Sequence, residues 1–160
     1  MTETRQLIQG EFSRKLDDRF RLTLPQEFEK QFSPEQGKCV IAKERPGCLS
    51  LWDEATWEKN DKKINLVRNK FDAGILELKI PQLQMLGRLL STRHRELKLA
   101  GRARLVVPEG FREFLGVEPE KDVMVIGAGI CIELWHPQKW LEYVGGEISG
   151  FGTLLDELAK

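Results

Sequence analysis

Basic side chains gather in two segments of the sequence and recur there at the same spacing. They are Lys15, Arg19, Arg21, Lys98, Arg102 and Arg104. Phe12–Arg21 holds four basic and two acidic residues, Arg93–Arg104 holds five and one, and Glu142–Lys160 holds one and four, although the whole chain has a formal net charge of zero. Charge segregated in this way suits a surface that faces phosphates, and a solvated strand face is the alternative interpretation.

Residues suited to catalysis or metal binding are scarce. The chain has two histidines and three cysteines, and no two cysteines form a C-x-x-C pair. An odd number of cysteines in a reducing compartment indicates free thiols rather than a disulfide framework. Because His94 and His136 lie far apart and neither stands in a nucleophile or base arrangement, we expect no catalytic residue, no metal and no cofactor.

The composition is that of a folded protein outside the membrane. Of 160 residues, 41% are apolar and 31% are charged, which is enough to bury a sizeable core. No window approaches the roughly 18 uninterrupted apolar residues of a membrane helix, and the opening residues lack the apolar core of a signal peptide. We therefore expect a cytoplasmic protein with no membrane partner. A net charge of zero also excludes binding to nucleic acid as a bulk polycation.

The sequence repeats itself. Sliding it by 83 residues matches Gly10–Trp57 to Arg93–Trp140 without a gap, and 14 of the 48 positions are identical. Ordinary residue frequencies would give about three identities. All four tryptophans fall in matched pairs, at the end of an apolar strand and the start of a helix, so we expect them in the core or between domains rather than stacked on bases. The match indicates a tandem duplication.

Each copy is predicted to form a β-hairpin, a short helix and a second β-hairpin. Alternation over 19–24 and 102–107 indicates half-buried strands whose arginines point outward. Preceding strands at 11–16 and 96–99, with turns at 17–18 and 100–101, complete the first hairpins. Pro25 and Pro108 are expected at the first helical position. The second hairpins are predicted from apolar runs at 39–42, 48–52, 123–126 and 131–135.

The fold class predicted is α+β, organised as a duplicated module. We expect a first repeat over 8–57, a helical connector over 58–90, a second repeat over 91–140 and a C-terminal helix or tail over 141–160. The connector is too apolar for a flexible linker, so the copies should pack into one pseudo-two-fold body. Leucines in the connector and tail exceed what one small body needs, which predicts self-association. They are Leu86, Leu89, Leu90, Leu154, Leu155 and Leu158.

Residues 10–12 and 16–25, their echo in the second half, and the stretches 125–126 and 132–135 with Trp140 resemble the bacterial MraZ family over about residues 10–145. That family duplicates a swapped-hairpin module akin to the AbrB and SpoVT DNA-binding domains, so the resemblance implies this fold. It also implies a transcriptional regulator that assembles into rings and binds short repeats upstream of the division and cell-wall gene cluster. Such a protein would be cytoplasmic and associated with the nucleoid.

The family carries a D-x-x-x-R signature on the first hairpin of each copy, usually with glycine before the arginine. Asp17 and Arg21 match it with Phe20 at the glycine position, whereas Arg104 has Ala100 in place of the aspartate. The resemblance therefore implies DNA contacts from Lys15, Asp17, Arg19, Arg21, Lys98, Arg102 and Arg104. Asp17 can orient the Arg21 guanidinium toward phosphate or guanine, and a structural ion pair is the alternative interpretation.

Two hypotheses about function follow. In the first, the partners are double-stranded DNA with repeated boxes and further copies of this chain in a ring. In the second, the chain is an antitoxin-like or scaffolding interaction protein of the same fold with weakened DNA binding, because Ala100 removes half of one signature.

Overall fold

The computed structural model describes residues 6–59, 61–101 and 103–160. The first repeat contains β1 (Ile8–Lys15), β2 (Arg21–Thr23), the 3₁₀ helices η1 (Gln26–Phe28) and η2 (Glu35–Gly37), β3 (Lys38–Arg45), β4 (Cys48–Asp53) and α1 (Glu54–Lys59). The connector forms α2 (Lys62–Asp72) and α3 (Ile80–Thr92). The second repeat and the tail contain β5 (His94–Lys98), β6 (Arg104–Val106), α4 (Arg112–Leu115), β7 (Asp122–Gly129), β8 (Ile132–Trp135), α5 (Pro137–Glu147), η3 (Ile148–Gly150) and α6 (Phe151–Leu158).

The strand pairs are antiparallel, and most of them join one repeat to the other. A six-stranded sheet has the order β1-β7-β8-β4-β3-β5, and β2 and β6 form a separate two-stranded ribbon. The first strand of each repeat therefore lies beside the third strand of the other repeat, β1 on β7 and β5 on β3. The second hairpins, β3–β4 and β7–β8, pair within a repeat, as the sequence predicted.

A local two-fold axis relates the two repeats. Leu22 pairs with Leu105 in the ribbon, and Ser50 pairs with Glu133 where the two second hairpins meet. Each of these pairs joins counterparts under the 83-residue shift, which requires an axis between them. The edge ladders are less symmetric. Leu97 pairs with Cys39, so exact symmetry would pair its counterpart Arg14 with Asp122. Arg14 pairs instead with Val123, a shift of one residue. The two repeats thus form the single pseudo-two-fold body that we expected.

The first hairpins differ from the prediction. The Asp17 amide donates to the Arg21 carbonyl, so the chain turns back where expected. In the part of the chain that the structure describes, however, β1 and β2 form no ladder with each other, because β1 pairs with β7 and β2 with β6. The prediction that the first two strands of each copy pair with each other as a hairpin is therefore wrong. Alternation identifies a strand and the face it buries, but not the strand with which it pairs.

The helices that follow β2 and β6 are shorter than an ordinary α-helix. A single 3₁₀ turn follows Pro25, and the four-residue α4 follows Pro108. Both prolines precede the helix instead of occupying its first position, which corrects the prediction by one residue or more. Gly116 ends α4 with a φ of 76°, the left-handed conformation that favours glycine at this position.

The core lies between the ribbon and the six-stranded sheet and draws on both repeats equally. Its buried counterparts are Leu22 and Leu105, Phe28 and Phe111, Cys48 and Cys131, and Leu51 and Leu134. The tryptophans pack in pairs within their own repeats, with ring centroids 6.0 Å apart for Trp52 and Trp57 and 5.3 Å apart for Trp135 and Trp140. These pairs lie where the second hairpin meets α1 or α5, and only Trp135 is buried, so the expected core position is confirmed for Trp135 while the other three tryptophans are half-buried.

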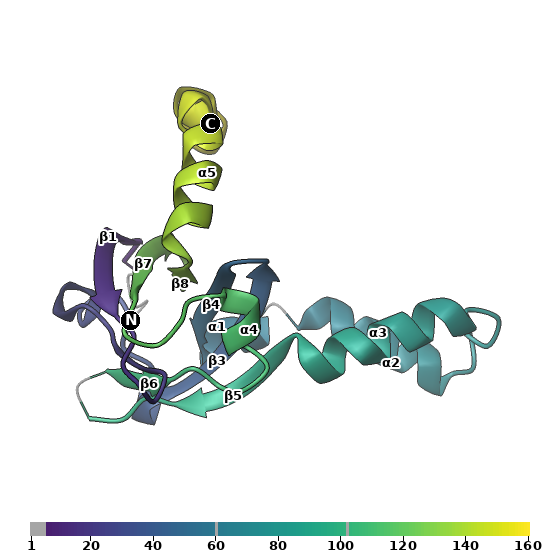
Figure 1. Cartoon of the computed structure of the whole chain (residues 1–160). Helices are drawn as coiled ribbons and strands as arrows, with labels where there is room; N and C mark the ends of the chain where they lie inside the picture. Colours follow the sequence, from purple (N-terminus) through teal and green to yellow (C-terminus); the bar gives the residue numbers. More distant parts are fainter. Residues whose placement is uncertain (1–5, 60, 102) are drawn as a thin grey trace.

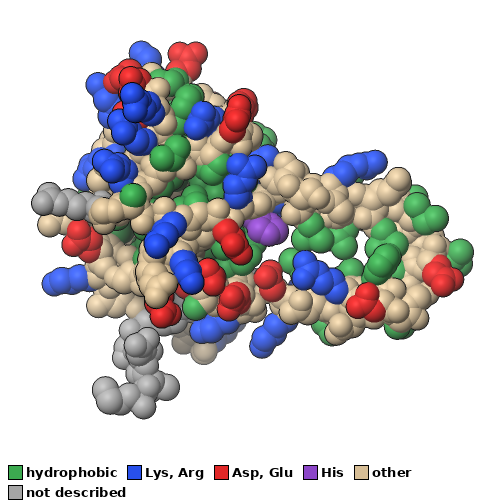
Figure 2. All heavy atoms as spheres, turned by 90° about the horizontal axis from the view of Figure 1, so that it is seen from below, with side chains coloured by type: hydrophobic (Ala, Val, Ile, Leu, Met, Phe, Trp, Pro, Cys, Tyr) green, Lys and Arg blue, Asp and Glu red, His purple; other side chains and the backbone are tan. Residues whose placement is uncertain are grey.

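Two helical arms leave the body. Figure 1 shows α2 and α3 extending away from the sheet as a hairpin, and α5 continuing into the C-terminal helix in another direction. Neither α2 nor α3 has a buried residue, and Figure 2 shows green apolar side chains along this arm. On α6, Phe151, Leu155 and Leu158 are more than half exposed. Within the described ranges, no helix is both long enough and apolar enough to cross a membrane.

The residue before each ribbon arginine has a strained backbone. Phe20 has a φ of 58° and Ala103 has a φ of 55°, in the left-handed region that L-residues rarely adopt. This conformation directs each carbonyl to the other repeat. The Leu24 amide donates to the Ala103 carbonyl at 3.0 Å, and the Val107 amide donates to the Phe20 carbonyl at 2.8 Å. The strain therefore accompanies two hydrogen bonds that join the repeats.

Replacing Ala103 by glycine is expected to raise the free energy of unfolding by about 0.5–1 kcal/mol. A left-handed L-residue costs roughly 1–2 kcal/mol, and the greater entropy of glycine in the unfolded chain takes back part of the gain. Urea unfolding followed by tryptophan fluorescence measures the change.

The matched control is Ala55→Gly, the same chemical change inside α1. At an ordinary helical φ it should lower the free energy of unfolding by roughly 0.5–1 kcal/mol. Loss of stability in both variants would contradict the assignment of strain to position 103.

Candidate nucleic-acid interface

The turn between β1 and β2 is built around the carboxylate of Asp17. Its Oδ1 accepts hydrogen bonds from the backbone amides of Arg19 at 2.9 Å and Arg21 at 2.8 Å. Its Oδ2 accepts one from Nε of Arg21 at 2.6 Å. Aspartate is common in turns because its short side chain reaches nearby backbone amides. One carboxylate therefore holds both the backbone of the turn and the side chain of Arg21.

This contact orients the Arg21 guanidinium and leaves its two terminal nitrogens able to donate further hydrogen bonds. Its Nε serves Asp17, and no other described residue forms a hydrogen bond or ion pair with its two terminal nitrogens. The Arg21 and Asp17 side chains are 38% and 36% exposed, so both are accessible to solvent. A planar group held in this way can bind a phosphate or the O6 and N7 of guanine with two parallel hydrogen bonds.

The pKa of Asp17 lies below its ordinary value. Partial burial raises it, but several interactions together outweigh that effect: the hydrogen bonds from the backbone and side chain of Arg21, the bond from the Arg19 amide, and the charge of Arg21. The carboxylate is therefore ionised at neutral pH, where it attracts the guanidinium. Its contribution to stability is complete above the ordinary carboxyl range and is lost as the pH falls through the lowered pKa.

The turn between β5 and β6 has a similar backbone without the carboxylate. Ala100 and Arg104 exchange two backbone hydrogen bonds, of 2.8 and 2.9 Å. In the first turn the equivalent amide of Arg21 donates to the Asp17 side chain, whereas here the Arg104 amide donates to the Ala100 carbonyl. Arg104 is exposed, and its side chain forms no hydrogen bond or ion pair with a described residue. The second arginine is thus placed but not oriented by an acidic partner.

Arg21 and Arg104 lie on one face of the β2–β6 ribbon. Arg21 pairs with Val106 and Thr23 pairs with Arg104, while the intervening Leu22 pairs with Leu105 and points into the core. Side chains of directly paired residues share a face, so these four residues form the outer face of the ribbon. The arginines are diagonal neighbours, for which Cα separations are about 7–8 Å. Their predicted outward direction is confirmed.

The other predicted residues that the structure describes lie outside strands β2 and β6. Lys15 and Lys98 end β1 and β5 and are exposed; Lys15 Nζ lies 3.9 Å from Glu120 Oε2. Arg19 is exposed at the tip of the first turn, and Arg102 lies outside the described residues. Alternation over 19–24 and 102–107 also places Thr23 and Val106 on the arginine face, as the ribbon pairing confirms, although neither was among the predicted DNA contacts.

The three cysteine thiols are buried and lie outside this face. Burial, with the charge of Asp53, raises the pKa of Cys39 to about 12. Burial and the carboxylates of Glu133 and Glu44 also raise the pKa values of Cys48 and Cys131. Protonated, buried thiols are poor nucleophiles and metal ligands. In residues 6–59, 61–101 and 103–160, no group of three or more His, Cys, Asp or Glu side chains is arranged to hold a metal ion.

Comparisons with known proteins agree with the duplicated architecture. The sequence model of a family described as "MraZ protein, putative antitoxin-like" matches residues 7–76 and 90–149. A relative from Syntrophomonas wolfei is 26% identical over 93% of this chain and 94% of its own length. Relatives from Leuconostoc mesenteroides and Nitrosospira multiformis are each 29% identical, over 95% and 78% of this chain and 96% and 78% of their own lengths. All three are named Transcriptional regulator MraZ.

Arg21→Ala is expected to raise the pKa of Asp17 toward its ordinary value, because it removes one hydrogen bond and a positive charge. The two backbone amides should preserve part of the shift. An NMR titration that follows the side-chain carboxyl carbon of each aspartate measures the change. Arg104→Ala removes an equal charge from the other turn and should leave the Asp17 pKa unchanged. Equal shifts in the two variants would contradict a direct Asp17–Arg21 effect.

Proposed function

Because the chain belongs to the MraZ family, we propose that it is a DNA-binding transcriptional regulator that contacts double-stranded DNA through the outer face of the β2–β6 ribbon. The names of its relatives support the regulatory role. The observation that carries the DNA contact is the 2.6 Å bond from Arg21 to Asp17, on the same ribbon face as the exposed Arg104.

Cationic side chains have two different roles in the proposed site. Arg21, held by Asp17, presents a fixed edge and reads the geometry of a base or phosphate. Arg104 acts mainly through its charge, because no acidic partner sets its angle. The other predicted contacts, Lys15, Arg19, Lys98 and Arg102, bind phosphates and set the position of the protein without specifying sequence.

Assembly compensates for the small number of cations in each site. A neutral chain with a few exposed cations binds DNA weakly, but tethered sites raise avidity about 10²–10⁴-fold. We infer a ring of copies on short repeats upstream of the division and cell-wall gene cluster, in the cytoplasm at the nucleoid. The exposed apolar residues of the two helical arms, among them Leu89, Leu154, Leu155 and Leu158, support self-association.

We further infer that residues 8–57 and 91–140 are two swapped hairpins of the AbrB type, joined by the connector 58–90 and followed by the tail 141–160. Support comes from the strand pairing, in which β1 joins β7, β5 joins β3 and β2 joins β6. This arrangement brings the two turns to a single ribbon, where both can approach one DNA duplex.

The second candidate is an antitoxin-like or scaffolding protein of the same fold. The observation that favours it is Ala100, which leaves Arg104 without the carboxylate that Arg21 has. Retention on DNA distinguishes the candidates, since retention that falls with salt requires phosphate contacts and an interaction protein needs none.

Arg21→Ala is expected to lower affinity for a repeat-containing duplex more than for a scrambled one. The loss of discrimination should be about 1–3 kcal/mol if Arg21 makes a bidentate base contact. Arg104→Ala should weaken both duplexes equally and reduce the slope of log affinity against log salt by about one for each phosphate contact removed. Fluorescence anisotropy titrations at several salt concentrations, with duplexes from upstream of the chain's own gene, measure both effects.

Lys70→Ala is the matched control, because it removes an equal charge from the arm formed by α2 and α3. It should leave both affinities unchanged. A more sequence-selective loss in Arg104→Ala than in Arg21→Ala would contradict the division of roles, and unchanged binding in both variants would contradict the site.

Light scattering at micromolar protein is expected to return a mass of several copies. Leu155→Glu should lower that mass, because it places a charge on the exposed apolar face of α6. Glu157→Gln, on the same helix, is the control and should leave the mass unchanged. A monomer mass for the unmodified chain would refute the ring.

A further inference from the structure

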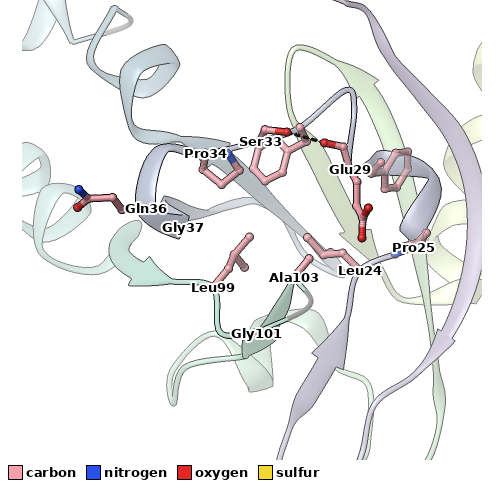
Figure 3. Close-up of a pocket in the computed structure, with 12 residues that line it drawn as sticks. Leu24, Pro25, Glu29, Ser33, Pro34, Gln36, Gly37, Leu99, Gly101 and Ala103 are labelled. Carbon is pink, nitrogen blue, oxygen red and sulfur yellow. Dashed lines mark hydrogen bonds between the residues drawn. The ribbon is translucent and has the colours of Figure 1, made fainter.

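A cavity lies beneath the turn of the second repeat. Its volume is about 480 Å³, within the range of small-molecule sites. The buried side chains of Leu24, Phe28 and Phe32 line it, together with Ala103 from the turn. Figure 3 shows the Glu29 carboxylate directed toward Leu24 and Ala103, into the space between the two repeats. The cavity therefore combines an apolar base with one acidic group.

The equivalent place in the other half of the molecule is filled. Under the 83-residue shift, Ala103 corresponds to Phe20 and Glu29 corresponds to Arg112. The Arg112 guanidinium lies over the Phe20 ring, 4.2 Å from its centroid, and Arg112 Nε donates to the Val107 carbonyl at 2.7 Å. One half of the molecule thus contains an aromatic ring against a cation. The other half has neither the ring nor the cation and carries a carboxylate there.

The walls of the cavity are held by the backbone. The Leu99 amide donates to the Gly37 carbonyl at 2.8 Å, and a Cβ at Gly37 would come within 2.8 Å of the Leu99 carbonyl oxygen. Gly37 also has a φ of 72°, which glycine adopts without strain. Because these groups are already in contact, the cavity does not need a ligand to form.

We propose that this cavity binds a small aromatic amine, meaning a primary ammonium group on a short carbon chain attached to an aromatic ring. The ring takes the place that Phe20 has in the other half, above the side chains of Leu24 and Phe28. The ammonium group pairs with Glu29, an exposed residue at the rim whose carboxylate belongs to none of the ion pairs among the described residues. The ligand must therefore be a cation, because the Glu29 carboxylate would repel an anion.

Benzylamine and phenethylamine are the probes, titrated into the full chain and followed by amide chemical shifts and calorimetry. We expect saturable binding, with shift changes at Gly37, Leu99 and Ala103. Phenylacetate, of similar size and opposite charge, should not bind. Glu29→Gln should weaken binding of the amines about two- to fivefold, as expected for losing an ion pair to a solvent-exposed carboxylate. Binding that ignores the sign of the ligand's charge would overturn the proposal.

Ala103→Phe tests the position of the ring. Phe20 shows that phenylalanine is accommodated at the equivalent left-handed φ, so the new ring should fill the cavity and abolish binding. Phe20→Ala should open the equivalent cavity beside Arg112 and favour phenylacetate over benzylamine. Saturable benzylamine binding by a folded Ala103→Phe variant, or none by the unmodified chain, would overturn the assignment. The Glu29→Gln and phenylacetate results stand independently if Ala103→Phe fails to fold. None of these measurements involves DNA, so their outcome is separate from that of the proposed function.

Discussion

Hydrogen bonding between the repeats is the constraint on which the rest of the structure depends. In the described part of the chain, β1, β2, β5 and β6 all take their ladder partners from the opposite repeat. A repeat on its own would leave these strands with unpaired amides and carbonyls, each costly to bury. The ribbon that carries the two arginines therefore requires both repeats. Because Leu22 and Leu105 sit back to back at the axis, the outer face of the ribbon carries one arginine from each repeat.

A single carboxylate distinguishes the structures of the two turns. Asp17 accepts two backbone amides with one oxygen and the Arg21 side chain with the other, so the guanidinium angle is coupled to the backbone of the turn. Ala100 cannot do this, and the backbone substitutes by closing a second hydrogen bond between Ala100 and Arg104. The fold therefore tolerates loss of the aspartate, whereas orientation of the arginine does not. The stability of the turn and the geometry of the site are separable properties.

The sequence predicted the positions of the strands and the direction of their side chains, which depend on local patterns. It did not predict which strands pair, because pairing depends on distant segments. The 83-residue shift identified the repeats, and alternation placed Arg21 and Arg104 outward, because the side-chain period of a strand is a local property. The same alternation could not reveal that β1 pairs with β7, since pairing is decided by the packing of distant segments. The strained backbone of Phe20 and Ala103 was also not foreseen. The glycine that the family usually has before the arginine is the signal of such a backbone, but this chain has Phe20 and Ala103 there.

Duplication within one chain permits an asymmetry that two identical subunits could not have. In a symmetric dimer, any residue that opens a cavity on one side opens it on both. Here the side with Ala103 and Glu29 has the cavity. On the other side, the equivalent residues Phe20 and Arg112 pack against each other. Loss of packing around an aromatic ring costs about 3–5 kcal/mol in a fully buried core, and less at a half-buried position such as that of Phe20. Confined to one half, that cost leaves the shared core and the ribbon intact, so the second turn is free to acquire a ligand while the first keeps the oriented arginine.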